Sequence, residues 1–167
     1  MPRVLSLSLV CLVTLVAGCG NEESSSEGSG KQPATMCESV APAVPEDWNL
    51  TKTSPEKGKA KTDCMLADAG GDTTLVVSFV KPESGSVEKA LKGVCEDYLG
   101  SPQDSDDEQC TKTGPVKLEG APAELQQAVR LEGSEGVLWM TFRTNYPDHA
   151  AGAEDMMEDV EDAVSQD

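Results

Sequence analysis

The stretch Thr73-Thr74-Leu75-Val76-Val77-Ser78-Phe79-Val80 decides the fold, because it is the clearest β-strand in the first half of the chain. Most of its residues are β-branched or aromatic, and such residues are enriched in strands. Successive side chains alternate between the faces of a sheet, so Leu75, Val77 and Phe79 are expected to share one face. Residues 63–69 form a second strand-like run just upstream. A glycine-containing turn joins the two runs, which predicts a β-hairpin.

A helix is expected to follow this hairpin. Ser86 is a good N-cap residue, and apolar residues recur at helical spacing from there to Leu99. Gly100 and Pro102 then end the pattern. Residues 51–61 contain four lysines with a proline and a glycine, and we interpret them as an exposed loop.

The second half of the chain predicts three more strands and a helix. Residues 110–118 are a possible strand, and residues 124–132 and 137–144 form a second hairpin around a Gly-Ser-Glu-Gly turn. The last strand has apolar residues on both faces, which favours a central position in the sheet. Residues 147–164 form a helix with an acidic outer face.

These elements occur in the order ββαβββα, which predicts an α+β fold. We expect an antiparallel sheet of about five strands with two helices packed on one face. We assign residues 1–18 to a signal segment, 19–36 to a disordered tether rich in serine, glycine and acidic residues, and 37–167 to a single globular domain.

Four cysteines of the domain predict two disulfide bonds, because an even number in an exported domain is typical of a disulfide framework. Three pairings are possible. We favour Cys37–Cys64 and Cys95–Cys110, since each joins sequence neighbours around one element. A zinc site or a redox pair is disfavoured, because the sequence has no C-x-x-C motif and His149 is its only histidine. We expect no cofactor.

The composition is strongly acidic. Thirteen Lys and Arg residues stand against thirty Asp and Glu residues, for a formal charge of −17. Such a charge argues against nucleic acid as a partner and against binding flat on an anionic membrane. We favour solubility outside the cell as its role, and a cationic ligand or partner is the alternative.

The N-terminus predicts export. Arg3 precedes an apolar run of 13 residues, Val4 to Val16, which is shorter than the roughly 20 residues of a membrane-spanning helix. Val16, Ala17, Gly18 and Cys19 follow the pattern of one aliphatic residue, two small residues and a cysteine. This segment resembles the lipobox of bacterial lipoproteins. The resemblance implies cleavage before Cys19 and attachment of lipid, including fatty acyl chains such as palmitate, to Cys19. An ordinary secretory signal is the alternative.

The element order and the cysteine positions from residue 37 onward resemble the small lipoproteins of actinobacteria, some of which have a fold similar to PsbP-like domains. This resemblance implies a fold and a place at the outer face of the cytoplasmic membrane. It implies no established activity and names no ligand.

Short motifs suggest two alternative functions. Ser86 and Lys89 match S-x-x-K, residues 105–107 nearly match S-D-N, and residues 112–114 match K-T-G, in the order found in penicillin-recognising serine enzymes. The three motifs lie within 29 residues of each other, however, and the middle one lacks its asparagine. A serine hydrolase is therefore an unfavoured alternative.

The loop 101–109 suggests the other alternative, a calcium-dependent adaptor. Its candidate ligands are four carboxylates, although the spacing of an EF-hand is missing: Asp104, Asp106, Asp107 and Glu108. Our leading hypothesis is a non-catalytic lipoprotein, attached to the membrane through lipid at Cys19, whose domain binds an envelope protein or a small ligand. We expect no catalytic residues and no metal.

Overall fold

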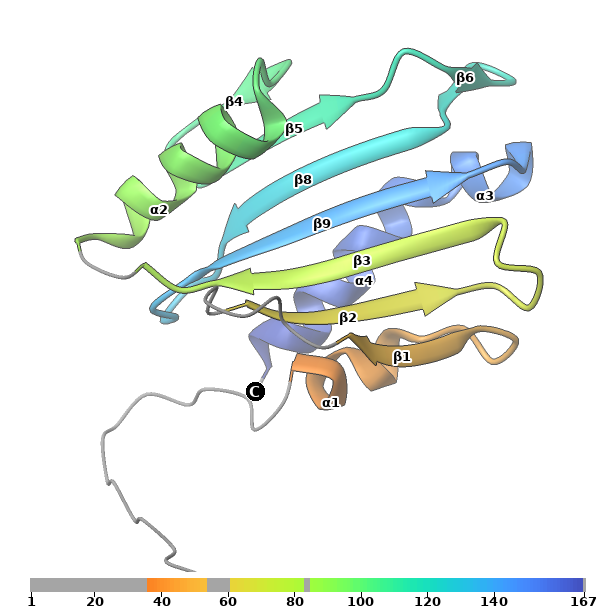
Figure 1. Ribbon diagram of the computed structural model, residues 1–167, viewed down its shortest axis with the longest axis horizontal. Helices are drawn as coiled ribbons and strands as arrows, with labels where there is room; N and C mark the ends of the chain where they lie inside the picture. Colours follow the sequence, from red (N-terminus) through yellow and green to blue (C-terminus); the bar gives the residue numbers. More distant parts are fainter. Residues whose placement is uncertain (1–35, 54–60, 83–84, 167) are drawn as a thin grey trace, which may run out of the picture.

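Two antiparallel hairpins meet at the centre of a seven-stranded sheet in the computed structural model, which describes residues 36–53, 61–82 and 85–166 (Figure 1). The strand order is β1-β2-β3-β9-β8-β5-β4. The strands of this sheet are β1 (Asn49–Thr53), β2 (Lys61–Ala67), β3 (Thr73–Val80), β4 (Asp104–Ser105), β5 (Gln109–Thr113), β8 (Glu124–Arg130) and β9 (Val137–Thr144). A separate two-stranded hairpin joins β5 to β8 and consists of β6 (Lys117–Leu118) and β7 (Ala121–Pro122).

The central contact of the sheet is the pairing of β3 with β9. Their register runs over eight residue pairs, from Thr73 opposite Thr144 to Val80 opposite Val137. β9 is the fourth of the seven strands, so the predicted central position of this strand is confirmed. Both predicted hairpins are confirmed as well, because β2 pairs with β3 and β8 pairs with β9.

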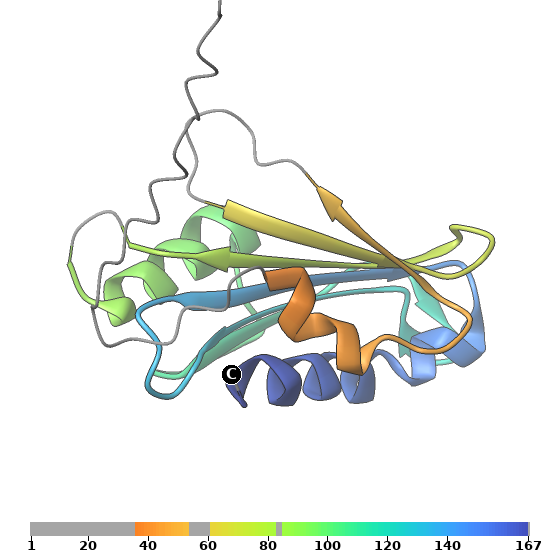
Figure 2. The ribbon, with the colours of Figure 1, turned by 90° about the horizontal axis from the view of Figure 1, so that it is seen from below.

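The helices lie on both faces of the sheet, and our expectation that two helices share one face is wrong (Figures 1 and 2). The helical elements are α1 (Met36–Val40), the 3-10 turn η1 (Ala41–Ala43), α2 (Val87–Gly93), the π-helix η2 (Val94–Leu99), α3 (Pro147–Ala151) and α4 (Ala153–Ser165). α1 and α4 share a core with Leu138, Met140 and Phe142 of β9. α2 and η2 share a separate core with Val137, and Trp139 packs against it. The alternation of β9 sends these two sets of side chains to opposite faces.

Two edge strands were not predicted from the sequence. Asn49–Thr53 forms β1 and pairs with β2, although we interpreted residues 51–61 as a loop. The central part of that loop, residues 54–60, lies outside the described residues. Asp104–Ser105 forms β4 within the expected acidic loop. Edge strands tolerate Lys and acidic side chains, because water solvates one side of their backbone. Their composition therefore resembles that of a loop.

Several element ends differ from the expected ones in detail. The segment after Ser86 starts as an α-helix and continues as a π-helix from Val94. The strand expected over residues 110–118 ends at Thr113, where Gly114-Pro115 interrupts it. Met36, which we assigned to the tether, is only 3% exposed and begins α1. The tether before Met36 and the signal segment lie outside the described residues.

Both predicted disulfide bonds are confirmed. Cys37 of α1 is bonded to Cys64 of β2, and Cys95 of η2 is bonded to Cys110 of β5. The Cα atoms of the two pairs are 5.4 Å and 6.1 Å apart. The first bond belongs to the core under α1 and α4, and the second to the core under α2 and η2. Each face of the sheet is therefore crosslinked to its own helix.

Removal of either disulfide should destabilise the domain through loss of loop closure in the unfolded chain. The bonds join residues 27 and 15 positions apart. The double substitution Cys95→Ala and Cys110→Ala should lower the free energy of unfolding by about 3 kcal/mol, and the corresponding change at Cys37 and Cys64 by slightly more. Urea titration of both variants measures this. Unchanged stability would contradict this prediction, because it would mean that the bond does not restrict the unfolded chain any further.

Candidate functional site

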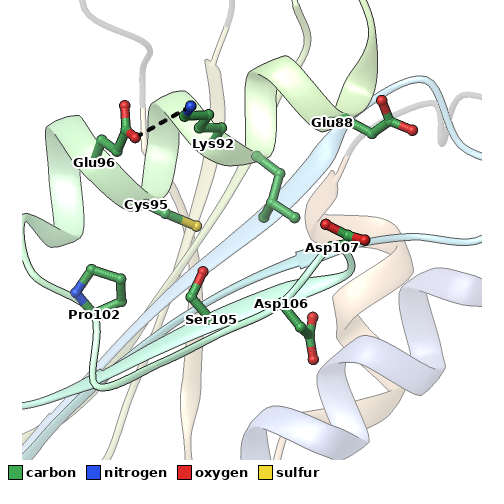
Figure 3. A pocket seen from close by; sticks show the side chains of 9 residues that line it. Glu88, Lys92, Cys95, Glu96, Pro102, Ser105, Asp106 and Asp107 are labelled. Carbon is green, nitrogen blue, oxygen red and sulfur yellow. Dashed lines mark ion pairs between the residues drawn. The ribbon is translucent and has the colours of Figure 1, made fainter.

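A cleft of about 660 Å³ lies between α2 and the segment that contains β4 (Figure 3). Its size is within the range of small-molecule sites in proteins. Residues from two sequence regions line it: Glu88, Leu91, Lys92, Cys95 and Glu96 from α2 and η2, and Pro102, Ser105, Asp106 and Asp107 from the opposite wall. The Cys95–Cys110 disulfide joins η2 to the sheet at this site.

The helical wall of the cleft is fixed at both ends. Ser86 caps the first turn, since its hydroxyl accepts a hydrogen bond from the Lys89 amide at 3.3 Å. At the other end, the Lys112 ammonium donates to the carbonyl of Leu99. Gly100 follows with φ of 81°, a conformation that suits glycine. The wall also changes from α to π geometry between these anchors, and such π segments are often found at functional sites.

The opposite wall is held by Asp106. One of its carboxylate oxygens accepts hydrogen bonds from the amides of Glu108 and Gln109, at 2.8 Å and 2.7 Å. These hydrogen bonds lower the pKa of Asp106 below its ordinary value of 3.8. The turn therefore positions Asp107, whose side chain points toward α2 (Figure 3).

The cleft is lined by more acidic than basic side chains and by apolar surface. Four carboxylates and one ammonium belong to the described residues that line it, and that ammonium, of Lys92, lies 3.7 Å from Glu96. The carboxylate of Glu88 lies 3.8 Å from the guanidinium of Arg130, a residue that does not line the cleft. Leu91 and Pro102 supply apolar surface. This combination suits a ligand that carries positive charge on an apolar body.

The four candidate calcium ligands are not brought together. Asp106 and Asp107 line the cleft, whereas Asp104 and Glu108 do not. Across residues 36–53, 61–82 and 85–166, no group of three or more His, Cys, Asp or Glu side chains is arranged to hold a metal ion. The geometry therefore gives the calcium hypothesis no support.

The three motifs of the serine hydrolase hypothesis also lie apart. Ser86 and Lys112 are at opposite ends of the helical segment, whose 13 residues span roughly 15–20 Å. Ser105 lies in the cleft, but Ser86 does not. The hydroxyl of Ser86 is exposed and serves as a helix cap.

A buried polar network at one end of the sheet escaped sequence reasoning. Thr73 is fully buried, and its Oγ1 lies 2.7 Å from Oγ1 of Thr144 and 2.5 Å from Nδ1 of His149. The carboxylate of Asp68, 9% exposed, lies 3.8 Å from the same ring nitrogen. Residues more than seventy positions apart meet here, so no local pattern could have indicated the contact.

Aromatic rings surround this network. The rings of Trp48 and Tyr146 lie 5.8 Å and 5.4 Å from that of His149, and the Tyr146 hydroxyl donates to Asp72 at 2.9 Å. This hydrogen bond, followed by the charge of Asp72, raises the pKa of Tyr146. Trp48 packs against the main core. The network joins the starts of β1, β3 and α3 to the end of β9.

A second, smaller groove of about 410 Å³ lies between α4 and the adjacent strands. Its walls are Thr111, Leu125 and Gln127 of the sheet and Glu154, Glu158, Glu161 and Asp162 of α4. Burial raises the pKa of Glu161, and the neighbouring charges of Asp162 and Glu158 add to this. Part of the acidic outer face predicted for the last helix therefore lines a groove.

None of the described helices is both long enough and apolar enough to cross a bilayer. Comparison of the chain with protein-family models, with curated proteins and with solved structures found no match.

Substitution of Thr73 by Val should destabilise the domain by about 1–3 kcal/mol, because it leaves buried partners of the hydroxyl without their hydrogen bond. Thr74 is the matched control, since it is the next residue of β3 and its side chain lies on the opposite face. Thr74→Val should change stability by less than about 0.5 kcal/mol. Thermal or urea unfolding of both variants measures the difference. Equal losses of stability in the two variants would contradict a contribution of the buried hydrogen bonds of Thr73.

Asp68 should make the domain sensitive to acid. Burial alone would raise the pKa of its carboxyl, but hydrogen bonds from Thr73, Gly71 and Asp72 outweigh burial and lower that pKa below 3.8. A carboxyl with a lower pKa in the folded state stabilises the fold above its unfolded pKa, and this contribution is lost as pH falls through the folded pKa.

The free energy of unfolding measured across the acidic range should therefore fall less steeply in Asp68→Asn than in the parent chain. Asp159→Asn, on the exposed side of α4, is the control and should retain the parent's slope. The same dependence of unfolding free energy on pH in all three proteins would contradict the assignment of acid sensitivity to Asp68.

Proposed function

We propose that this chain is a lipid-anchored lipoprotein at the outer face of the cytoplasmic membrane and that its domain binds a ligand without catalysing a reaction. The anchor is Cys19, which ends the Val16-Ala17-Gly18-Cys19 segment. Stable anchoring requires more than one acyl chain, which the proposed modification supplies. The two disulfide bonds support export, because such bonds persist in oxidising compartments and are rare in the cytosol.

The observation that carries the binding proposal is the cleft between α2 and β4. It combines a volume suited to a small molecule, walls fixed by a helix cap and a disulfide, and a lining of carboxylates and apolar side chains. We infer that its ligand is an organic cation with an apolar body, because the carboxylates of the lining attract positive charge and its apolar side chains can contact an apolar body. Binding rather than catalysis is supported by the role of the Ser86 hydroxyl as a helix cap.

The resemblance to PsbP-like lipoproteins of actinobacteria is compatible with this proposal. A mixed α+β architecture with a mostly antiparallel sheet is what that resemblance implies. Its contribution is limited to fold and location, so the proposed ligand class rests on the residues of the cleft alone.

The N-terminus of the chain isolated from its native membrane tests the anchor. Mass spectrometry should find Cys19 as the first residue, with a thioether-linked diacylglycerol. Cys19→Ser should abolish lipid labelling and leave the leader attached, because the hydroxyl cannot be alkylated as the thiol is. An unmodified Cys19 at the N-terminus, or a leader retained by the parent chain, would contradict the anchor and leave the cleft untouched.

Isothermal titration calorimetry with benzyltrimethylammonium at low salt tests whether the cleft binds an organic cation. The parent chain should bind this cation, and Asp107→Asn should weaken binding by up to about fivefold, the effect of one exposed charge contact of about 1 kcal/mol. Asp159→Asn changes the net charge equally on the other side of the molecule and should leave the affinity unchanged. Absence of binding, or equal weakening in both variants, would contradict a site in the cleft.

A further inference from the structure

An exposed tyrosine at one end of the sheet is held in place by residues from both hairpins. Tyr146 follows β9 and is 43% exposed, and its hydroxyl donates a hydrogen bond at 2.9 Å to Asp72, in the turn between β2 and β3. The side-chain amide of Asn145 donates to the other carboxylate oxygen of Asp72 at 3.3 Å. The backbone amide of Asn145 donates to the carbonyl of Asp72 at 3.2 Å, and that of Tyr146 to Oγ1 of Thr144 at 3.0 Å. These bonds restrain the ring and the two polar side chains relative to one another.

The ring of Tyr146 is supported by His149 and stays accessible. The centroids of the two rings lie 5.4 Å apart, and the ring planes are inclined at 82°. Perpendicular rings meet edge to face, so His149 can cover at most one face of Tyr146. His149 is in turn hydrogen bonded through Nδ1 to the buried hydroxyl of Thr73. A ring that is already held by its neighbours loses little conformational freedom when a ligand packs on it.

The groups around this ring match a ligand that has many hydroxyls. Each carboxylate oxygen of Asp72 accepts one of the hydrogen bonds above and can accept another. The side-chain amide of Asn145, an exposed residue, also has a carbonyl oxygen and a second N–H. The C–H groups on the face of a sugar ring carry partial positive charge, which suits the negative face of an aromatic ring. One sugar can therefore pack on Tyr146 and bond to both polar side chains.

The surroundings of Tyr146 favour a neutral sugar chain over other ligands. Hot spots of protein interfaces are normally surrounded by contacts that exclude water, whereas Asp72, Asn145 and Asp148 are all exposed. The formal net charge of −17 repels an anionic ligand. Both disulfide bonds are typical of proteins outside the cytosol, where envelope polysaccharides occur.

We propose that Tyr146, Asp72 and Asn145 form a second binding site, which takes a neutral β-linked glycan. In such a glycan the hydroxyls project from the edges of the sugar rings, so the ring faces are flat and present C–H groups. One face packs on Tyr146, and hydroxyls at its edge bond to Asp72 and Asn145. The site is separate from the cleft, since α2 and α3 lie toward opposite ends of the sheet (Figure 1). Binding is weak, because an exposed ring encloses little of the ligand.

NMR titration of the isotope-labelled full-length chain with cellohexaose and with chitohexaose, each up to about 10 mM, tests the site. The backbone amide signals of Asp72, Asn145 and Tyr146 should shift as the glycan binds. The two glycans differ in the acetamido group of chitohexaose. Binding of both would support recognition through hydroxyls and ring faces, and binding of chitohexaose alone would support the site and add the acetamido group to what it recognises.

Substitutions at the two tyrosines distinguish stacking from a general loss of structure. Tyr146→Ala should raise the dissociation constant about tenfold, whereas Tyr146→Phe keeps the ring and should raise it less than about threefold. Tyr98→Ala is the matched control and should bind like the parent, because Tyr98 is also 43% exposed and its ring lies 4.7 Å from that of Trp139, in η2 and β9 respectively. Asn145→Ala leaves the ring in place and should weaken binding about threefold, which provides a second test if Tyr146→Ala fails to fold.

Three results would overturn the proposal. The first is that neither glycan shifts the amide signals of Asp72, Asn145 and Tyr146. The second is that Tyr98→Ala weakens binding as much as Tyr146→Ala, or that Tyr146→Phe does. The third is that benzyltrimethylammonium shifts these signals while both glycans leave them unchanged, which would assign the ring to a cation. None of these results depends on the lipid anchor or on the ligand of the cleft.

Discussion

β9 lies between β3 and β8, and its side chains contact a core on each face of the sheet. This double burial is the constraint on which the architecture depends. A shift of one residue in its register would exchange the two sets of side chains between the faces. The entry to β9 fits this constraint closely. A Cβ atom at Gly136 would lie 2.3 Å from the ring of Phe79, so any other residue there would require this ring to move.

The two hydrophobic cores differ in size and in the elements they support. The larger one, under α1 and α4, holds most of the fully buried side chains, including Phe142 and Met157. The smaller one supports α2 and η2, which form one wall of the cleft. A disulfide joins a helix to the sheet in each core. The cleft is therefore built on a support that is covalently tied to the sheet, so its walls can keep their spacing without a bound ligand.

The sequence predicted those parts of the fold that local patterns control. Alternation over residues 73–80 and 137–144 indicated both hairpins, Ser86 indicated the start of α2, and neighbouring cysteines indicated the disulfide pairs. It did not predict which face each helix covers, because an apolar stripe on a helix carries no sign of the side on which it packs.

The functional surfaces were predicted less well for a similar reason. Asp106 and Asp107 were singled out as carboxylates, but the cleft appears only when their segment lies opposite α2 in space. The contact of Thr73 with His149 joins positions 76 apart, and neither residue has a local pattern that indicates it. Edge strands such as β1 resemble loops, since their exposed positions accept lysine.

The position of the Cys37–Cys64 bond has a mechanical consequence. Cys37 lies in α1, which precedes every strand of the sheet in sequence, so a pull from the N-terminal side reaches this covalent link before it reaches a strand. The load then passes directly to β2, whose hydrogen bonds to β1 and β3 share it laterally. The helix at the entry cannot be peeled away beyond Cys37 while the bond is intact. Under tension applied at the N-terminal end, the load would therefore be carried by the sheet and not by the short helix α1.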